Sequence, residues 1–361
     1  MTRRCGDYAV TMKRAALLVP GSLATLTGGY GYDRQIVAGL RNESWHIDVY
    51  ELDSSFPRPT RAALAAADRL FASFPDGLPV IVDGLAYGAL PELAAAHGAR
   101  LRLVALVHHP LALETGLPQA LADRFAASER VALGHARHVV VTSRSTARAL
   151  ATYGVEPQRI TVIEPGTDRS APSPVSTSGI VELLCVGTLV PRKGHATLIE
   201  ALAQLTDKAW RLTCVGSDTR DPVNARALRR QVRELGLADR IVFTGEVATD
   251  VLEQHYREAH VFVLATHHEG YGMALAEAIA HGLPIVCTRA GAVPETLPAE
   301  ACLVVPPGDS AAVARALAAL LDEPALRLRL ATAAAAAGRR LPTWQQASAR
   351  FAAVLDAAIR T

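Results

Sequence analysis

Short apolar runs alternate along the chain with longer Ala- and Leu-rich segments in which apolar residues recur at helical spacing. Runs that are apolar throughout are typical of strands buried on both faces of a parallel sheet, and the helical segments between them supply the crossovers. The sequence therefore predicts an α/β fold with strands at residues 15–20, 47–50, 80–83, 103–107, 139–142 and 160–163, and again at 181–186, 212–215, 241–243, 261–264, 284–287 and 303–305.

This alternation occurs twice, which predicts two domains. A chain of 361 residues is longer than one hydrophobic core usually supports. Residues 170–179 are rich in Pro and Ser and have no apolar period, as linkers do. We therefore expect two Rossmann-like, doubly wound domains, over residues 1–169 and 180–342, that face each other across a cleft.

The two ends of the chain differ in pattern. Residues 1–11 show no periodicity, and Met12 is a second possible start, so we expect either a disordered tail there or residues that are not part of the native chain. Residues 343–361 place Trp344, Phe351 and Leu355 at helical spacing. This pattern predicts a final helix that buries one face.

Composition and charge limit the classes of protein to which this chain can belong. Hydrophobic residues make up 50% and charged residues 20% of the chain, as in ordinary globular proteins. The formal net charge is +2 and basic residues are not clustered, so we expect no nucleic-acid partner. No run approaches the ~20 apolar residues of a membrane-spanning helix. Four of the five cysteines lie in apolar runs, which favours reduced thiols and a cytoplasmic location.

Residues 266–288 carry the strongest chemical signal. A predicted strand ends just before this segment, Glu269 lies in the loop that follows, and a predicted helix carries Glu277. The free N–H groups of such a helix start favour an anion, and glycines let the backbone approach a ligand. Glu277 is suited to accept hydrogen bonds from ribose hydroxyls. Solvated glutamates would explain Glu277 alone, but not the glycine-rich loop that links the two, which reads Gly270, Tyr271, Gly272 and Met273.

Two adjacent cations follow another predicted strand. Arg192 and Lys193 stand directly before Gly194 and a helical pattern. Arginine offers a bidentate fork and lysine a point charge, which together suit a diphosphate. A solvated basic loop is the alternative. Lys193, however, is one of only three lysines among 37 basic residues, so its position is informative.

The N-terminal half offers weaker candidates. Gly28 and Gly29 lie in a loop between a predicted strand and a predicted helix, which suits contact with a phosphate or a substrate, although a flexible loop explains them almost as well. His108 and His109 come directly after a buried strand. The carboxyl ends of parallel strands open onto the ligand crevice of such sheets, so we expect these histidines at its mouth.

Missing motifs constrain the chemistry further. The chain has no GxGxxG, GxxxxGK[ST], HExxH or GxSxG motif, and no DxD pair that would hold a metal diphosphate. We therefore expect no metal ion and no bound cofactor. Protein cations and helix dipoles would take the place of the metal at a diphosphate.

In these residues the chain resembles the retaining glycosyltransferases of family 4, which have the GT-B fold. The resemblance covers nearly the whole chain after residue 12. The family's paired-glutamate motif matches Glu269 and Glu277, its donor loop matches Arg192-Lys193-Gly194, its Gly-Gly loop matches Gly28-Gly29 and its N-domain histidine matches His108. Two positions depart from the family pattern: Thr188 replaces a frequent arginine, and Pro165 replaces the asparagine of an NGVD motif.

The resemblance implies a sugar transferase that uses a nucleoside-diphosphate sugar, with UDP as the family-level expectation. It implies a donor site in the second domain, an acceptor site in the first and a final helix that crosses back. His108, Glu269, Lys193 and Arg192 would be the catalytic residues. A nucleotide-sugar epimerase or phosphorylase on the same fold and a non-catalytic nucleotide-sugar sensor remain alternatives.

The acceptor is not named by the sequence. A small metabolite, a glycan or a sugar-bearing lipid all remain open. Residues 56–74 combine Arg58, Arg61 and Arg69 with several apolar side chains. This segment is expected to be an ordinary helix of the acceptor domain, with contact to a membrane surface as the less favoured alternative.

Overall fold

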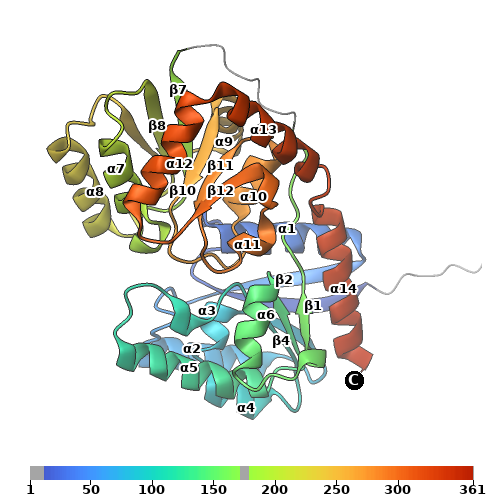
Figure 1. Ribbon diagram of the computed structural model, residues 1–361. Coiled ribbons are helices and arrows are strands. Elements are labelled where there is room, and N and C mark those ends of the chain that lie inside the picture. The colour runs from blue at the N-terminus through green and yellow to red at the C-terminus, as the bar shows by residue number, and fades with distance from the viewer. Residues whose placement is uncertain (1–11, 171–178, 361) are drawn as a thin grey trace, which may run out of the picture.

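The computed structural model describes residues 12–170 and 179–360. It has two lobes, each built on a six-stranded parallel sheet (Figure 1). This architecture confirms the predicted α/β class with two doubly wound sheets. The expected N-terminal tail, residues 1–11, and most of the expected linker, residues 171–178, lie outside the described residues.

All twelve predicted strands are present, with ends that differ by no more than two residues from those expected. The first sheet contains β1 (Lys13–Pro20), β2 (Trp45–Leu52), β3 (Pro79–Asp83), β4 (Arg102–Val107), β5 (His138–Val141) and β6 (Ile160–Val162). The second contains β7 (Val181–Val186), β8 (Trp210–Val215), β9 (Ile241–Gly245), β10 (Val261–Leu264), β11 (Ile285–Thr288) and β12 (Cys302–Val305).

Helices cover the sheets of both lobes. In the N-terminal half they are α1 (Gly28–Asn42), α2 (Arg61–Ser73), α3 (Gly84–Tyr87), α4 (Pro91–His97), α5 (Gln119–Gly134) and α6 (Arg144–Ala151). In the C-terminal half they are α7 (His195–Ala203), α8 (Pro222–Glu234), α9 (Thr249–Glu258), α10 (Met273–Ala280), α11 (Val293–Thr296), α12 (Ser310–Asp322), α13 (Pro324–Gly338) and α14 (Trp344–Arg360). Polar side chains cap the N-termini of several of these helices. Thr27, for example, accepts a hydrogen bond from the N–H of Tyr30 at the start of α1.

Strand order determines where each sheet opens. The first sheet has the order β2-β1-β3-β4-β5-β6, and the second has the order β12-β11-β10-β7-β8-β9. Ligand crevices form where the direction of strand succession reverses. That point lies between β1 and β3 in the first sheet and between β7 and β10 in the second. The loops that follow these four strands are therefore the ones placed to bind a ligand.

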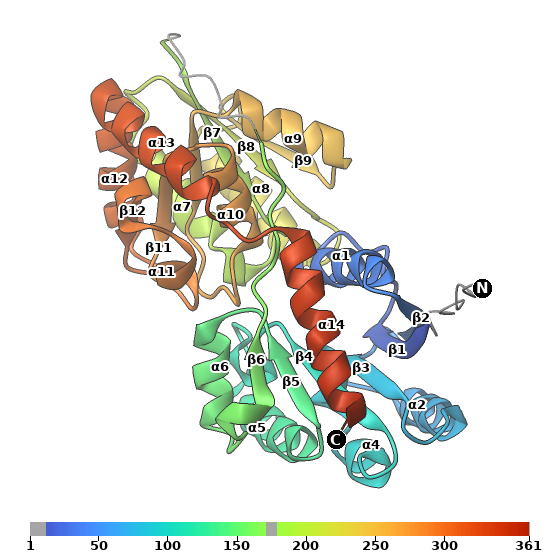
Figure 2. The ribbon, with the colours of Figure 1, turned by 90° about the vertical axis from the view of Figure 1, so that its right-hand side faces the viewer.

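The last helix, α14, packs on the N-terminal lobe although the chain reaches it from the C-terminal lobe (Figures 1 and 2). It lies against α1 so closely that a Cβ at Gly39 would stand 1.9 Å from Ser348 Oγ. Phe351 and Leu355 are fully buried in the same hydrophobic cluster as Val19 and Leu106 of the first sheet. The apolar face that the sequence predicted for this helix thus completes the core of the opposite lobe.

Loss of the Phe351 ring should destabilise the N-terminal lobe. Phe351→Ala leaves a cavity between α14 and the first sheet, and truncation of a buried Phe typically costs about 3–5 kcal/mol. We expect urea unfolding of the variant to begin at lower denaturant concentration. Ile359→Ala is the matched control on the same helix, because the Ile359 side chain is 43% exposed, and it should unfold like the wild type. Equal effects of the two substitutions would contradict the packing described.

Candidate active site

A cleft of about 930 Å³ lies between the lobes, where the carboxyl ends of both sheets face each other. Loops from both switch points line it. Every residue that the sequence predicted for the site is among the lining residues: Gly28, Gly29, His108, Arg192, Lys193, Glu269, Gly270, Tyr271, Gly272, Met273 and Glu277. The structure therefore brings the candidates of the two halves together in one space.

Lys193 and Glu269 form an ion pair at the C-terminal wall of this cleft. Lys193 Nζ lies 2.8 Å from Glu269 Oε1, and the two side chains are only 16% and 6% exposed. Burial alone opposes ionisation of Glu269, but Lys193 and then Arg192 outweigh it, so the pKa of Glu269 is lowered. The pair thus joins the loop after β7 to the loop after β10.

Gly194 makes this joining possible. The residue has a φ of +68°, and a Cβ there would stand 1.8 Å from the carbonyl oxygen of Ala265. Only glycine fits so close to a neighbouring backbone with that conformation. Lys193 is therefore held against the end of β10, beside Glu269.

Arg192 reaches across the cleft. Its Nη1 donates to the carbonyl oxygen of His268, 2.8 Å away, and its Nε lies 3.2 Å from Glu114 Oε1 in the N-terminal lobe. Burial opposes ionisation of Glu114, but His109 and Arg192 outweigh it and lower the pKa of Glu114 to about 2. Both cations of the loop therefore already face carboxylates, and a diphosphate would have to bind between such pairs.

Sequence reasoning did not identify Glu114 as a site residue. It lies in the loop after β4, where nothing in the local pattern distinguishes it from a solvated acid. Only the approach of the two lobes places it opposite Arg192.

Glu277 also lines the cleft, one turn into α10. The Tyr256 hydroxyl donates to Glu277 Oε2, 2.8 Å away. Burial raises the pKa of Glu277 to about 7, although the bond from Tyr256 acts in the opposite direction. The position of this carboxyl group on the wall of the cleft is compatible with the predicted hydrogen bonds from ribose hydroxyls.

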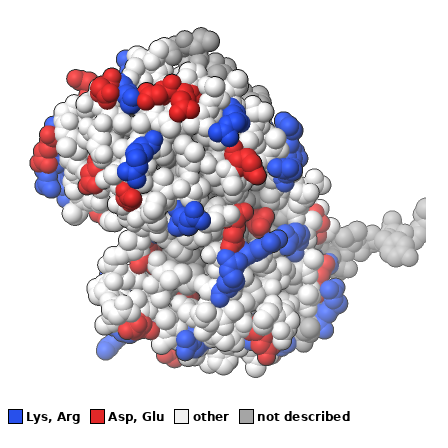
Figure 3. Space-filling view, in the orientation of Figure 1, with Lys and Arg blue, Asp and Glu red and all other residues white. Residues whose placement is uncertain are grey.

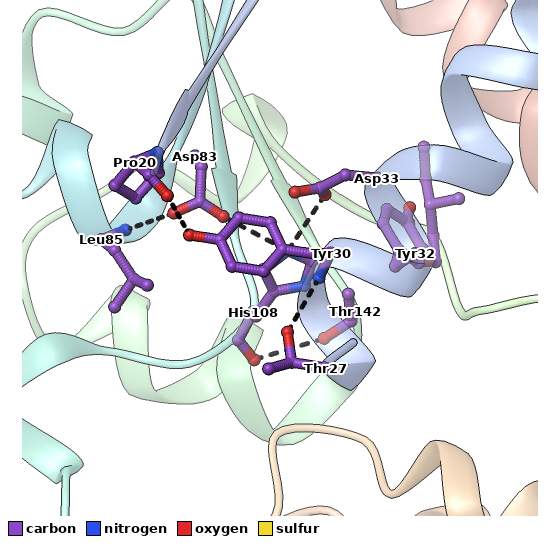
Figure 4. A network of polar contacts seen from close by, with 10 residues as sticks. Pro20, Thr27, Tyr30, Tyr32, Asp33, Asp83, Leu85, His108 and Thr142 are labelled. Atoms are coloured by element: carbon purple, nitrogen blue, oxygen red, sulfur yellow. Dashed lines mark hydrogen bonds and ion pairs between the residues drawn. The ribbon is translucent and has the colours of Figure 1, made fainter. Parts of the chain in front are cut away.

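His108 is held by two buried carboxyl groups that the sequence analysis missed (Figure 4). Its Nε2 lies 3.2 Å from Asp33 Oδ1 and 3.5 Å from Asp83 Oδ2. Asp83 ends β3, next to the strand that His108 follows. Asp33 lies in the middle of α1, where an acid is usually solvated. The nearness of Gly29, whose Cβ would stand 3.3 Å from His108 Cδ2, brings α1 against the ring.

The lobes touch at the glycine-rich loop. A Cβ at Gly270 would stand 2.2 Å from the carbonyl oxygen of His108, so this contact requires a glycine. Beside it, the rings of His109 and His268 lie 5.7 Å apart across the cleft. Burial and the neighbouring His109 lower the pKa of His268 to about 4. The candidate site is thus assembled by contact between the two lobes.

Two groups of side chains in the described part of the chain place three possible metal ligands within 4.8 Å of one another. One is the Asp33–Asp83–His108 cluster, whose closeness is accounted for by ion pairing. The other consists of Cys185, His195 and Cys214, all three of which are buried. The thiols of Cys185 and Cys214 are free, as are those of Cys287 and Cys302.

On the face shown in Figure 3, Lys and Arg are interspersed with Asp and Glu, apart from one short diagonal run of basic side chains. In the segment at residues 56–74, Phe56, Phe71 and Phe74 are buried, and Leu64 is 37% exposed. The apolar side of α2 thus packs into the core, as an ordinary helix does. Within residues 12–170 and 179–360, no helix combines the length and apolar character needed to cross a bilayer.

Two family models match the chain, one in each lobe. The model described as Glycosyltransferase Family 4 matches residues 29–171, and the model described as Glycosyl transferases group 1 matches residues 181–323. Together they span most of both sheets.

Individual proteins that are similar to this chain are also glycosyltransferases. The MMP alpha-(1->4)-mannosyltransferase of Mycolicibacterium hassiacum is 27% identical over 333 residues, which cover 87% of this chain and 79% of that protein. The GDP-mannose-dependent alpha-(1-6)-phosphatidylinositol monomannoside mannosyltransferase of Mycolicibacterium smegmatis is 34% identical over 200 residues, 50% of either chain. The chain therefore spans only half the length of this second relative.

A solved structure shares the arrangement of both lobes. The Anabaena protein HepE, in complex with UDP and glucose, superposes with a TM-score of 0.75 at 18% identity and covers 94% of this chain and 99% of its own. At this identity the likeness concerns the fold.

Enlargement of Gly270 should keep the lobes apart. In Gly270→Ala the new Cβ collides with the His108 carbonyl oxygen, a backbone atom that cannot turn away. A displacement of about 1 Å at a reacting centre can lower the rate by roughly 10²-fold. We expect small-angle scattering to show a larger radius of gyration for the variant. Gly134→Ala, which meets no atom within 4 Å, is the control and should match the wild type. Unchanged dimensions in Gly270→Ala would argue against this contact in solution.

Proposed function

Because the chain belongs to the family 4 group of glycosyltransferases with the GT-B fold, we propose that it transfers a sugar from a nucleoside-diphosphate donor to a hydroxyl group with retention of the anomeric configuration. The observation that carries the proposal is the meeting of Lys193 and Glu269 with His108 in one cleft. A donor that spans the cleft would touch all three.

The C-terminal lobe supplies the proposed donor site. Glu277 would bind the ribose, while Arg192, Lys193 and the start of α10 at Gly272–Met273 would face the diphosphate. Negative charge grows on the diphosphate as the sugar leaves, so cations next to it stabilise the transition state more than the ground state. Glu269 holds Lys193 in place for this role and faces the sugar.

The diphosphate would bring no metal with it under this proposal. Two protein cations and one helix start already offer it positive charge. Each cation has a carboxylate partner, which fixes its position before the donor arrives. Such preorganised charge costs no rearrangement when the reaction occurs.

The N-terminal lobe would bind the acceptor. His108 stands opposite Lys193 and Glu269, and Gly28 and Gly29 form the adjoining wall. Retention is compatible with attack from the face that the diphosphate leaves, with a diphosphate oxygen taking the acceptor proton. The names of the two relatives specify MMP in one case and phosphatidylinositol monomannoside in the other, and the acceptor of this chain is open to a hydroxyl of a metabolite, a glycan or a lipid.

The nucleotide of the donor is less well determined than the type of reaction. UDP is the nucleotide expected from the family, and HepE was solved with UDP and glucose. The name of the M. smegmatis relative specifies GDP-mannose. Both donors therefore belong in the test.

A donor and acceptor screen tests the reaction. UDP-glucose and GDP-mannose are each incubated with acceptor mixtures in EDTA, and products are detected by mass spectrometry. We expect turnover that survives EDTA and a new α linkage, seen by NMR, from an α-linked donor. A β product would contradict retention. A requirement for Mg²⁺ or Mn²⁺ would contradict the assignment of Arg192 and Lys193 as the counter-charge.

Substitutions should separate the roles of the two lobes. Lys193→Ala removes charge that acts before and during cleavage, so KM should rise and kcat should fall. Glu277→Ala removes contacts to the unreacting ribose, so KM should rise by about 10–100-fold, the equivalent of about 1.5–3 kcal/mol, with little change in kcat. His108→Ala should mainly lower kcat, by roughly 10²–10⁴-fold.

Binding of the nucleoside diphosphate, measured by calorimetry, is the control for these roles. Lys193→Ala and Glu277→Ala should weaken it, and His108→Ala should leave it nearly unchanged. The opposite result, with loss of binding only in His108→Ala, would exchange the roles assigned to the two lobes.

A further inference from the structure

Asp33 and Asp83 approach one nitrogen of His108 from two different elements. The distances from Nε2 are 3.2 Å to Asp33 Oδ1 and 3.5 Å to Asp83 Oδ2. The two acids are only 1% and 2% exposed. Burial of a carboxyl group is unfavourable unless a partner compensates for it. Their shared partner indicates that both acids act on His108.

The second carboxylate oxygen of each acid has few other partners, which makes the contact with the His108 ring important for both acids. Asp83 Oδ1 accepts the N–H of Leu85, 2.8 Å away, at the start of α3. Asp33 Oδ2 is buried without a hydrogen-bond partner among the described residues. A buried oxygen without a partner costs stability. The contact between Asp33 Oδ1 and His108 therefore offsets the cost of burying Asp33.

The groups that pack around the His108 ring leave its Nδ1 accessible from the cleft. The edge of Tyr32 packs against the ring, with centroids 5.5 Å apart, and Gly29 covers the Cδ2 and Nε2 side. The His108 side chain is 21% exposed and lines the cleft. With Nε2 turned toward the acids, Nδ1 is the nitrogen that can meet a ligand.

We propose that Asp33 and Asp83 are positioning residues that keep His108 doubly protonated, so that Nδ1 offers an N–H donor to an oxygen of the substrate. This rests on the proposed function for the identity of that substrate. A ring in this state cannot accept the acceptor's proton. His108 is thereby excluded as the general base, and the proton must pass to another group, such as a diphosphate oxygen.

Asp33 supplies most of the charge that supports this assignment. Burial alone would lower the pKa of His108, but Asp33 and then Asp83 outweigh it, so the pKa is raised. Burial and the neighbouring Asp33 raise the pKa of Asp83 to about 7, so Asp83 is partly neutral near that pH and contributes less charge than Asp33. Tyr30 and Tyr32 on α1 also face the cluster and stay neutral, since burial raises both pKa values, that of Tyr30 to about 12. From the C-terminal lobe, Gly270 contacts the carbonyl of His108 and brings no charge.

Imidazole NMR of the intact, 15N-histidine-labelled protein tests the assignment without any substrate. The signals missing in His108→Gln identify the ring. We expect its titration midpoint to lie above the usual ~6.5 and to fall by about one unit or more in Asp33→Asn. Asp83→Asn should lower it too and serves as a second variant if Asp33→Asn does not fold. A midpoint below ~6.5, or one that neither variant lowers, overturns the proposal.

Asp68→Asn is the matched control. Asp68 also faces a histidine of the same lobe, His97, with 3.6 Å between Oδ1 and Nε2, but it is exposed and does not line the cleft. This substitution should leave the His108 signals unchanged. An equal shift in Asp68→Asn would show a general charge effect and contradict the specific role of Asp33.

The pH profile of donor hydrolysis, with UDP-glucose and GDP-mannose as probes, gives the kinetic readout. A required imidazolium makes kcat fall as pH rises through the pKa of His108. Asp33→Asn should move this fall to lower pH and leave KM nearly unchanged. If kcat instead rises through that pKa, His108 works as a neutral acceptor and the proposal is wrong. Lack of turnover with either donor would count against the proposed function, while the NMR titration would still decide the role of Asp33 and Asp83.

Discussion

The ion pair between Lys193 and Glu269 holds together the part of the molecule on which the candidate site depends. It links two loops that come from neighbouring strands, β7 and β10, at the point where the second sheet opens. Removal of one partner from a buried pair leaves an uncompensated charge, which typically costs about 3–5 kcal/mol. The pair therefore fixes the distance between the loops, and Gly194 supplies the close backbone approach that the pair needs.

Contacts between the two lobes also help to define the site, but they constrain it less tightly than the contacts within a lobe. Arg192 faces Glu114, Arg148 pairs with Glu295, and Gly270 rests on the backbone of His108, so the lobes meet largely through charged and backbone groups. Interfaces between domains that are this polar usually permit relative motion. The site is thus rigid within each lobe and adjustable between them.

Sequence reasoning identified most of what the local pattern encodes. Apolar runs marked all twelve strands, because strands buried on both faces need no polar positions. Arg192, Lys193 and Glu269 were found because they lie in the loops that follow such runs. Asp33 and Glu114 were missed for a different reason. One lies in mid-helix and the other in a loop, and their roles depend on strand order and on the meeting of the lobes, which no local pattern contains. Asp83 ended a predicted strand, but the adjacency of β3 and β4 was needed to relate it to His108.

The crossing of α14 has a consequence for how the protein is made. The N-terminal sheet is synthesised first, yet Phe351, Leu355 and Ala358 form part of the hydrophobic cluster on one of its faces. Domains generally fold in the order in which they leave the ribosome. Here that order cannot be completed, because α1 covers only part of this face and the rest stays uncovered until residues 344–360 have emerged. During translation the nascent chain therefore carries an apolar patch of the sheet and of α1 exposed through the synthesis of the whole second lobe, a period in which a chaperone could bind it.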